Sequence, residues 1–290
     1  MGTSAKYGGP SPTSALIPTF LDVLTPAIPT SEKEELPAKP ETPENPTEKA
    51  DQKPVPAKAL PPLPPPSSAG RFKSSRSSFN VFAGTRDNTA LRKSLSSYVR
   101  SGTGGGRGAT RRMGSAISAV GKAIGFAQSV ARDGIDKALS NLGLGTLIGQ
   151  PAEQVLAVLT DVFCPNGGPI DQGIAREAWD EAVLELTELE IADVKDVSAE
   201  QWQALIVDFI TRTIETKVIN DVGTKGISLP QDVGAIDQLQ TDLHELIVGA
   251  VNDAIGDRLG VGQVIPQNQI QGVVTDIYDR SFAYLEALEE

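Results

Sequence analysis

The residue types that most often perform chemistry are scarce in this chain. Its 290 residues include one histidine, His244, and one cysteine, Cys164. A single cysteine excludes an internal disulfide and a cysteine-rich zinc site, and a single histidine removes most histidine-based catalysis. We interpret His244 as a surface or boundary residue and Cys164, which precedes a proline turn, as a buried small apolar group. Cys164 also fits a reducing cytoplasm.

Carboxylates are numerous, but none stands out as a catalytic couple. Neighbouring pairs occur at Asp180/Glu181, Glu188/Glu190, Asp193/Asp196 and Asp276/Asp279. Each pair falls on an expected helix surface or in a loop, where such residues ordinarily form a solvated face. No nucleophile–base set, metal-ligand cluster or cofactor motif accompanies them. The sequence therefore predicts a protein that is not an enzyme and that binds neither a metal nor a cofactor.

The glycine-rich run 102–112 invites comparison with a phosphate-binding loop. That interpretation fails because no Lys-Ser/Thr pair follows the glycines and no strand precedes them. We interpret residues 101–108 instead as a flexible joint.

Charge is divided sharply along the chain. Residues 71–137 carry 13 basic and three acidic side chains, whereas residues 151–290 carry seven basic and 26 acidic ones. Opposite potentials of this size steer association. Either the two parts attract each other, within one chain or between copies, or one of them binds an outside partner.

The basic segment 71–112 interleaves cations with aromatic rings. Its candidate contact residues are Arg71, Lys73, Arg76, Arg107, Arg111 and Arg112. Arginine suits phosphate contact and aromatic rings suit base stacking, so nucleic acid is one candidate partner. The acidic part of the chain and a protein partner remain alternatives.

Apolar residues recur at helical spacing from residue 109 onward, and no alternating strand pattern competes. We therefore expect an all-α fold, with residues 109–290 forming one acidic helical bundle of about six or seven helices. Ser198 and Gln201 form a capping box at the start of one helix. Trp179 and Trp202 are expected in the core. Asp87 or Asn88 could cap a shorter helix that runs through Tyr98.

Small residues are frequent over 109–131, where Gly121-xxx-Gly125 resembles a membrane dimer motif. Because Lys122 interrupts this short stretch, we expect close helix packing in a bundle. No uncharged apolar run is long enough to span a bilayer. A membrane-acting effector that uses residues 113–131 is the weaker alternative.

The first 70 residues hold most of the 21 prolines and are expected to be disordered. We divide the chain into an N-terminal recognition motif (1–10), a proline-rich tether (11–70), a basic segment with a short helix (71–108) and the helical domain (109–290). The run Leu60–Pro66 favours an extended polyproline conformation.

The N-terminal motif has its own chemistry. Removal of Met1 would leave Gly2 with a free α-amine whose pKa is about 7.7–8.0, so part of it is neutral and nucleophilic at cellular pH. Tyr7 supplies an anchoring ring, and Gly8 and Gly9 allow the backbone to bend or to lie flat in a narrow groove. The alternative is an ordinary disordered end.

Two stretches resemble the QatB proteins of the bacterial four-component Qat anti-phage defence system. They are Met1-Gly-Thr-Ser with Tyr7-Gly-Gly-Pro10, and Leu95 to Gly114 around Gly-Gly-Gly-Arg107. The resemblance implies a cytoplasmic, non-enzymatic component that acts with QatA, a predicted ATPase, with QatC, which resembles the deazaguanine-synthesis enzyme QueC, and with QatD, a TatD-like nuclease.

The resemblance also implies a mechanism. QatC would grip the N-terminus through Thr3, Ser4, Tyr7, Gly8, Gly9 and Pro10, and would join a 7-deazaguanine carboxylate to a protein amine. Gly2 is the candidate acceptor if only Met1 is removed, and Gly8 or Gly9 if the chain is cut further in. The alternative is a nucleic-acid-binding adaptor that serves the ATPase and the nuclease through residues 71–112.

Overall fold

The computed structural model describes residues 70–165, 170–187, 191–223, 227–230, 232–259 and 264–289. These residues form helices and connecting turns, and the one β-type pairing among them is an isolated bridge between Pro151 and Asp193. They all belong to one compact unit, Pro62–Glu290. The predicted all-α class is therefore confirmed. The N-terminal motif 1–10 and residues 11–69 of the expected tether lie outside the described residues.

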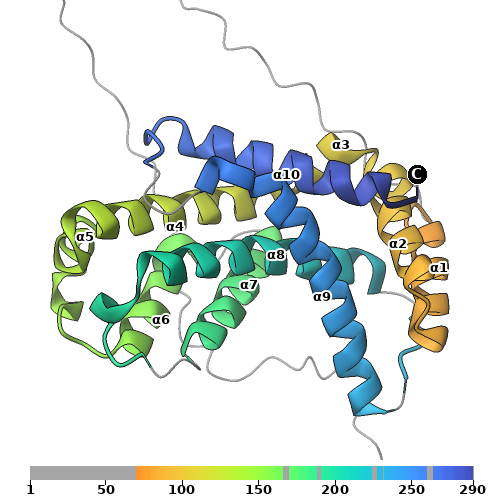
Figure 1. Ribbon diagram of the computed structural model, residues 1–290, viewed down its shortest axis with the longest axis horizontal. Helices are drawn as coiled ribbons and strands as arrows, with labels where there is room; N and C mark the ends of the chain where they lie inside the picture. The colour runs from red at the N-terminus through yellow and green to blue at the C-terminus, as the bar shows by residue number, and fades with distance from the viewer. Residues whose placement is uncertain are drawn as a thin grey trace, which may run out of the picture. The chain divides into compact units, whose positions relative to one another are not determined.

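Figure 1 shows the helices in chain order. The expected bundle contains α4 (Gly114–Asp133), α5 (Ile135–Asn141), α6 (Ala152–Phe163), α7 (Ile170–Thr187), α8 (Ala199–Gly223), α9 (Val233–Ile255) and α10 (Ile270–Glu286). Three further helices precede it: α1 (Lys73–Thr85), α2 (Asn88–Ser97) and α3 (Gly106–Thr110). Among the described residues, the bundle thus has the predicted number of helices.

Aromatic rings join the centre of the bundle. Trp179 on α7 contacts Phe163 on α6 and Phe209 on α8, with ring centroids 5.0 and 5.2 Å apart. Phe126 on α4 lies 5.6 Å from Trp202 on α8. These edge-to-face contacts link four helices in geometries that aromatic pairs prefer. Both tryptophans are buried, as predicted.

Local signals set two helix starts as expected. At α8 the backbone N–H of Gln201 donates to Ser198 Oγ at 3.2 Å, and the N–H of Ser198 donates to Gln201 Oε1 at 2.8 Å. This reciprocal pair is the predicted capping box. At α2 the Asp87 carboxylate accepts from the N–H of Thr89 at 2.9 Å.

Hydroxyl groups hold α1 against α2 in a helical hairpin. Ser75 and Ser94 are buried, their Oγ atoms lie 3.2 Å apart, and Ser94 Oγ also donates to the carbonyl of Ser75. Short side chains let the two helices approach closely, and the hydroxyls satisfy one another there. The turn contains Arg86, which has a φ of 61° and closes the end of α1.

The expected flexible joint at 101–108 is wrong. The chain passes from α2 through a π-helical turn, Tyr98–Thr103, directly into α3. Gly104 and Gly105 take left-handed φ values of 83° and 91°, and a Cβ on Gly108 would collide with the carbonyl of Thr103. Here glycine serves a tightly wound connection, because other residues do not fit these conformations.

The joint is also tied to the end of α10. Glu286 accepts a hydrogen bond from the N–H of Gly106 at 3.0 Å, and its carbonyl accepts one from Ser96 Oγ at 2.8 Å. Residues far apart in the sequence therefore fix this connection in place.

Close packing accounts for the small residues of α4. Gly121 lies against Gln271 and Ile270 at the start of α10, and Gly125 lies beside Gln267. A side chain on Gly121 would force Gln271 to move. The expectation of tight helix packing is met, and no helix in the described part of the chain is long and apolar enough to cross a membrane.

Residues 71–108 differ from the separate segment we expected. Phe82 of α1, Leu95 of α2 and Val99 are fully buried in the same core as Phe209 and Phe282. The α1–α2 hairpin packs against α8 and α10. The apolar residues of this segment therefore complete the bundle core, while its cations are exposed or half-buried.

Candidate functional site

The α1–α2 hairpin carries an open groove on its outer side. Its lining comprises Gly70, Arg71, Lys73, Ser74, Ser77, Ser78, Val81, Asp87, Thr89, Ala90, Lys93 and Ser101. We call this set the basic groove. Three of its side chains are cationic and one is anionic, and five more carry hydroxyl groups.

The six cations predicted from the sequence have different surroundings. Lys73, Arg107 and Arg111 are exposed, whereas Arg71, Arg76 and Arg112 are half-buried. Arg76 donates to the carbonyl of Val222 at 2.9 Å, which caps the end of α8. Arg71 and Lys73 lie in the basic groove, so sequence reasoning found part of this surface. It missed Lys93 and the serines, whose contribution depends on how α2 packs against α1.

The aromatic residues of this segment do not serve as predicted. Phe72, Phe79, Phe82 and Tyr98 are each at most 9% exposed, and all four belong to the core. Base stacking by these rings is therefore excluded in this structure. Phosphate contact is the part of the nucleic-acid prediction that the geometry still allows.

A stack of aromatic and charged groups begins at one end of the basic groove. The Arg71 guanidinium lies 4.6 Å from the centroid of the Phe72 ring, which stacks on Tyr98 at 5.3 Å. The Tyr98 hydroxyl donates to Asp221 at 3.0 Å, and Lys217 lies 3.5 Å from the same carboxylate. Burial raises the pKa of Tyr98 well above its usual value, so this hydroxyl remains a proton donor.

Arg71 has an unusual electrostatic position at this end. Its Nε atom is buried without a hydrogen-bond partner among the described residues. Burial and the neighbouring positive charge of Arg112 lower the pKa of Arg71 from its ordinary value, and the nearby Asp221 carboxylate only partly opposes them. A further anion near the two guanidinium groups would relieve this repulsion.

The acidic pairs found in the sequence form structural contacts. Glu181 pairs with Arg212 at 3.1 Å, Asp193 with Lys195 at 2.7 Å and Asp276 with Arg280 at 2.8 Å. Glu188 and Glu190 lie outside the described residues. Within the described part of the chain, no group of three or more His, Cys, Asp or Glu residues could hold a metal ion.

Arg212 on α8 is the centre of an ionic cluster that sequence reasoning missed. It contacts Asp208 at 2.7 Å, Glu185 at 2.8 Å and Glu181 at 3.1 Å. Burial alone would lower the pKa of Arg212, but the hydrogen bonds to Asp208 and Glu185 raise it above the ordinary value. Only the helical spacing of Asp208 and Arg212 signalled this cluster in the sequence.

His244 on α9 extends this cluster and is partly buried. Its Nδ1 lies 3.0 Å from Glu215 and its Nε2 lies 3.7 Å from Asp208. The hydrogen bond to Glu215 raises the pKa of His244 above the ordinary value. The expected boundary position is confirmed, and the two carboxylates give the ring a pH-dependent contact.

Cys164 is 1% exposed and has the apolar role predicted for it. Burial raises the pKa of its thiol to about 12. The thiolate, which is the nucleophilic form, is therefore scarce at neutral pH.

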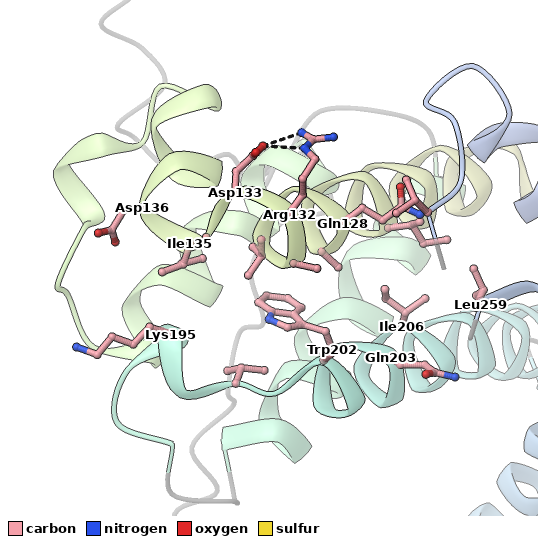
Figure 2. Close-up of a pocket in the computed structure, with 18 residues that line it drawn as sticks. Gln128, Arg132, Asp133, Ile135, Asp136, Lys195, Trp202, Gln203, Ile206 and Leu259 are labelled. Carbon is pink, nitrogen blue, oxygen red and sulfur yellow. Dashed lines mark hydrogen bonds and ion pairs between the residues drawn. The ribbon is translucent and has the colours of Figure 1, made fainter. Parts of the chain in front are cut away.

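An apolar cavity of about 740 Å³ lies where α4 and α5 meet α8. Figure 2 shows Trp202 between α4 and α8, with Arg132 and Asp133 paired to each other at the rim. Ile124, Val130 and Ile206 add to its apolar lining. Its volume falls in the range of small-molecule sites. No site residue predicted from the sequence lines it.

The predicted N-terminal contact residues lie outside the described residues. These are the acceptor Gly2, with its alternatives Gly8 and Gly9, and the partner contacts Thr3, Ser4, Tyr7 and Pro10. Their roles stay predictions.

Comparison with known proteins places the described fold in one family. The protein-family model of the Qat anti-phage system associated protein QatB matches residues 104–285. Searches of curated proteins and of solved structures gave no match. The matched region begins at the glycine-rich connection and runs through α3 to the end of α10, so it covers more than half of the chain. This chain belongs to the QatB family, and it is thus a component of the Qat anti-phage defence system.

Proposed function

We propose that this protein presents its N-terminal segment, residues 1–10, to the QueC-like enzyme QatC and serves as its protein substrate. Membership of the Qat system carries the proposal, because it implies partners within that system. The protein itself acts as a non-enzymatic component in the bacterial cytoplasm. QatA and QatD are the further partners that the family implies.

The properties of the helical domain, as far as the structure describes it, support a role in presenting the N-terminal segment. Its prominent ionic groups, such as Arg212 and Glu286, are used in contacts between helices. The thiol of Cys164 is buried and protonated at neutral pH. A body with these properties suits a scaffold that carries a segment recognised by another protein.

The chemistry at the segment is amide formation. QatC activates the carboxylate of a 7-deazaguanine with ATP as an acyl adenylate and releases pyrophosphate. The neutral amine of Gly2 then attacks the acyl carbon, the bond to AMP breaks and the attacking nitrogen loses a proton. Gly2 suits this step because its α-amine has a pKa of about 7.7–8.0 and it has no side chain to hinder attack.

A deletion tests the binding step. Removal of residues 2–10 should abolish co-purification of QatC and phage defence while circular dichroism and thermal unfolding stay unchanged. A deletion of equal length inside the tether, residues 41–49, is the matched control and should retain both. QatC that binds the first variant as tightly as the full chain would contradict the proposal.

Fragment mass spectrometry of the N-terminal peptide identifies the acceptor. Expressed with QatC, the full chain should carry the adduct on the amine of Gly2. An adduct on Gly8 or Gly9 would show that the chain is first cut further in. An adduct on Lys6 would contradict acylation of an N-terminal amine.

A further inference from the structure

The basic groove has the dimensions and direction of an extended ligand site. It follows α1, whose 13 residues span about 20 Å at 1.5 Å per residue. Ser74, Ser77 and Val81 recur every three or four residues along α1, so they lie in one row that faces the groove. Gly70 lines the groove just before the helix begins. Figure 1 shows α1 and α2 side by side at one end of the bundle.

The two lysines of the groove are not paired with a carboxylate within the described part of the chain. Neither Lys73 nor Lys93 has a carboxylate within ion-pair distance there, and both are exposed. Arg92 on α2 is exposed as well. From residue 70 to residue 132 the sequence contains a single carboxylate, Asp87, which is engaged in capping α2. The surface therefore complements a polyanion.

The residues that line the groove indicate which polyanion fits it better, an acidic protein or a nucleic acid. A protein partner is usually anchored by aromatic or large aliphatic side chains in pockets. Val81 is the one large aliphatic residue in the groove, and the nearby rings Phe72 and Tyr98 are buried in the core. Interfaces with nucleic acid are polar, cationic and rich in hydroxyl contacts to phosphate. Ser77 and Ser101, which are exposed, supply such hydroxyls.

We infer that the basic groove binds the sugar–phosphate backbone of nucleic acid, with Lys73, Lys93 and Arg71 contacting phosphates. Among the described residues, the lining of the groove has no planar amide of the kind that reads adenine and no exposed ring for stacking. Because its three cations are assigned to phosphates, the inference predicts binding that is independent of base sequence. A duplex binds at least as well as a single strand, because it has the higher charge density and the single strand gains no stacking.

The fold holds Arg71 in a position suited to contact a phosphate. Its guanidinium is held over the Phe72 ring, and its Nε has no partner among the described residues. A phosphate at this end of the groove would accept from Arg71 and offset its repulsion with Arg112. This end adjoins Gly70, so the site lies on the folded body and does not require the N-terminal motif.

Fluorescence anisotropy with a labelled DNA duplex of arbitrary sequence, titrated with the full chain at several salt concentrations, tests the inference. Lys73→Glu and Lys93→Glu should each weaken binding several-fold and lower the slope of log affinity against log salt by about 1 or more. Lys137→Glu, an exposed lysine on α5 away from the groove, changes net charge equally and should bind like the original protein. Circular dichroism confirms that all variants are folded.

Several outcomes would overturn the inference. Absence of salt-dependent binding at low salt would do so. Equal losses of DNA affinity in Lys137→Glu and Lys73→Glu would show that DNA is attracted by the charge of the whole surface, not by the groove. A single strand that binds much more tightly than the duplex would mean that bases stack on the protein. Competition by poly-glutamate as strong as competition by unlabelled DNA would assign the groove to an acidic protein partner.

Discussion

In the acidic part of the molecule the cations are surrounded by carboxylates, whereas the two lysines of the α1–α2 hairpin, Lys73 and Lys93, face solvent. Arg86 in the hairpin turn is different, because it pairs with Asp242 at 3.0 Å. Arg212 on α8 contacts three carboxylates, and Lys217 contacts Asp171 and Asp221. Lys73 and Lys93 have no such partners in the described part of the chain. The same residue types therefore hold helices together in one region and leave charge available for a ligand in the other.

The two regions nevertheless share one hydrophobic core, and this can be tested first. Phe82 on α1 and Phe209 on α8 are both fully buried. Replacing either with alanine should cost about 3–5 kcal/mol of unfolding free energy. Both tryptophans, Trp179 and Trp202, lie in the acidic part. Urea unfolding followed by tryptophan fluorescence should therefore shift for Phe82→Ala as much as for Phe209→Ala. An unshifted fluorescence transition for Phe82→Ala would mean that the hairpin unfolds independently.

The glycine-rich connection offers a second, smaller effect. Gly108→Ala places a methyl group against the carbonyl of Thr103 and should cost about 1–3 kcal/mol. Gly114→Ala, at the start of α4, meets no atom within 4 Å and should be neutral or stabilise by up to about 1 kcal/mol. Thermal unfolding measures both. Equal unfolding temperatures for the two variants would instead support the interpretation of residues 101–108 as a flexible joint.

Arginine substitutions compare the two uses of charge directly. Arg212→Ala leaves partly buried Asp208 without its cation and should cost about 1.5–3 kcal/mol. Arg92→Ala, on the exposed face of α2, should change stability by at most about 0.5 kcal/mol. Chemical denaturation at neutral pH measures the unfolding free energy of both variants. Comparable losses of unfolding free energy would show that Arg92 also has a structural role.

The smallest expected effect is the pH dependence due to His244. Its folded pKa lies above the unfolded value near 6.5, so the folded state binds the proton more tightly. The stabilisation is fully present below pH 6.5 and is lost as pH rises through the folded pKa. The stability difference between the original protein and His244→Gln should therefore shrink above pH 6.5. A difference that grows with pH would contradict the contact with Glu215.

Local signals were sufficient to predict much of the helical architecture. Apolar spacing located the bundle helices, and the Ser198 and Gln201 pair marked the start of α8 correctly. The cap of α2 was predicted as Asp87 or Asn88, and Asp87 takes this role with a side chain that acts only two residues away. The last helix, α10, starts at Ile270, four residues after Pro266, because a turn intervenes. Helix ends depend on such short-range details.

Features that depend on distant residues could not be predicted. The glycines at 102–108 look flexible until Glu286 at the far end of the chain is placed beside Gly106. Phe72 and Phe79 look available for stacking until Phe72 is placed against Tyr98 and Gly102, and Phe79 against Phe82 in the core. The cavity near Trp202 and the cluster around Arg212 each combine side chains from separate helices. The N-terminal site rests on resemblance and chemistry, because Gly2 lies outside the described residues.

Conjugation at the N-terminus is best measured by the intact mass of this protein, expressed with and without its QatC partner. With QatC, we expect loss of Met1 and a mass gain equal to one 7-deazaguanine carboxylic acid minus water. The gain should be absent without QatC and absent when residues 2–10 are deleted. An unmodified full chain recovered from cells with active QatC and intact phage defence would contradict it.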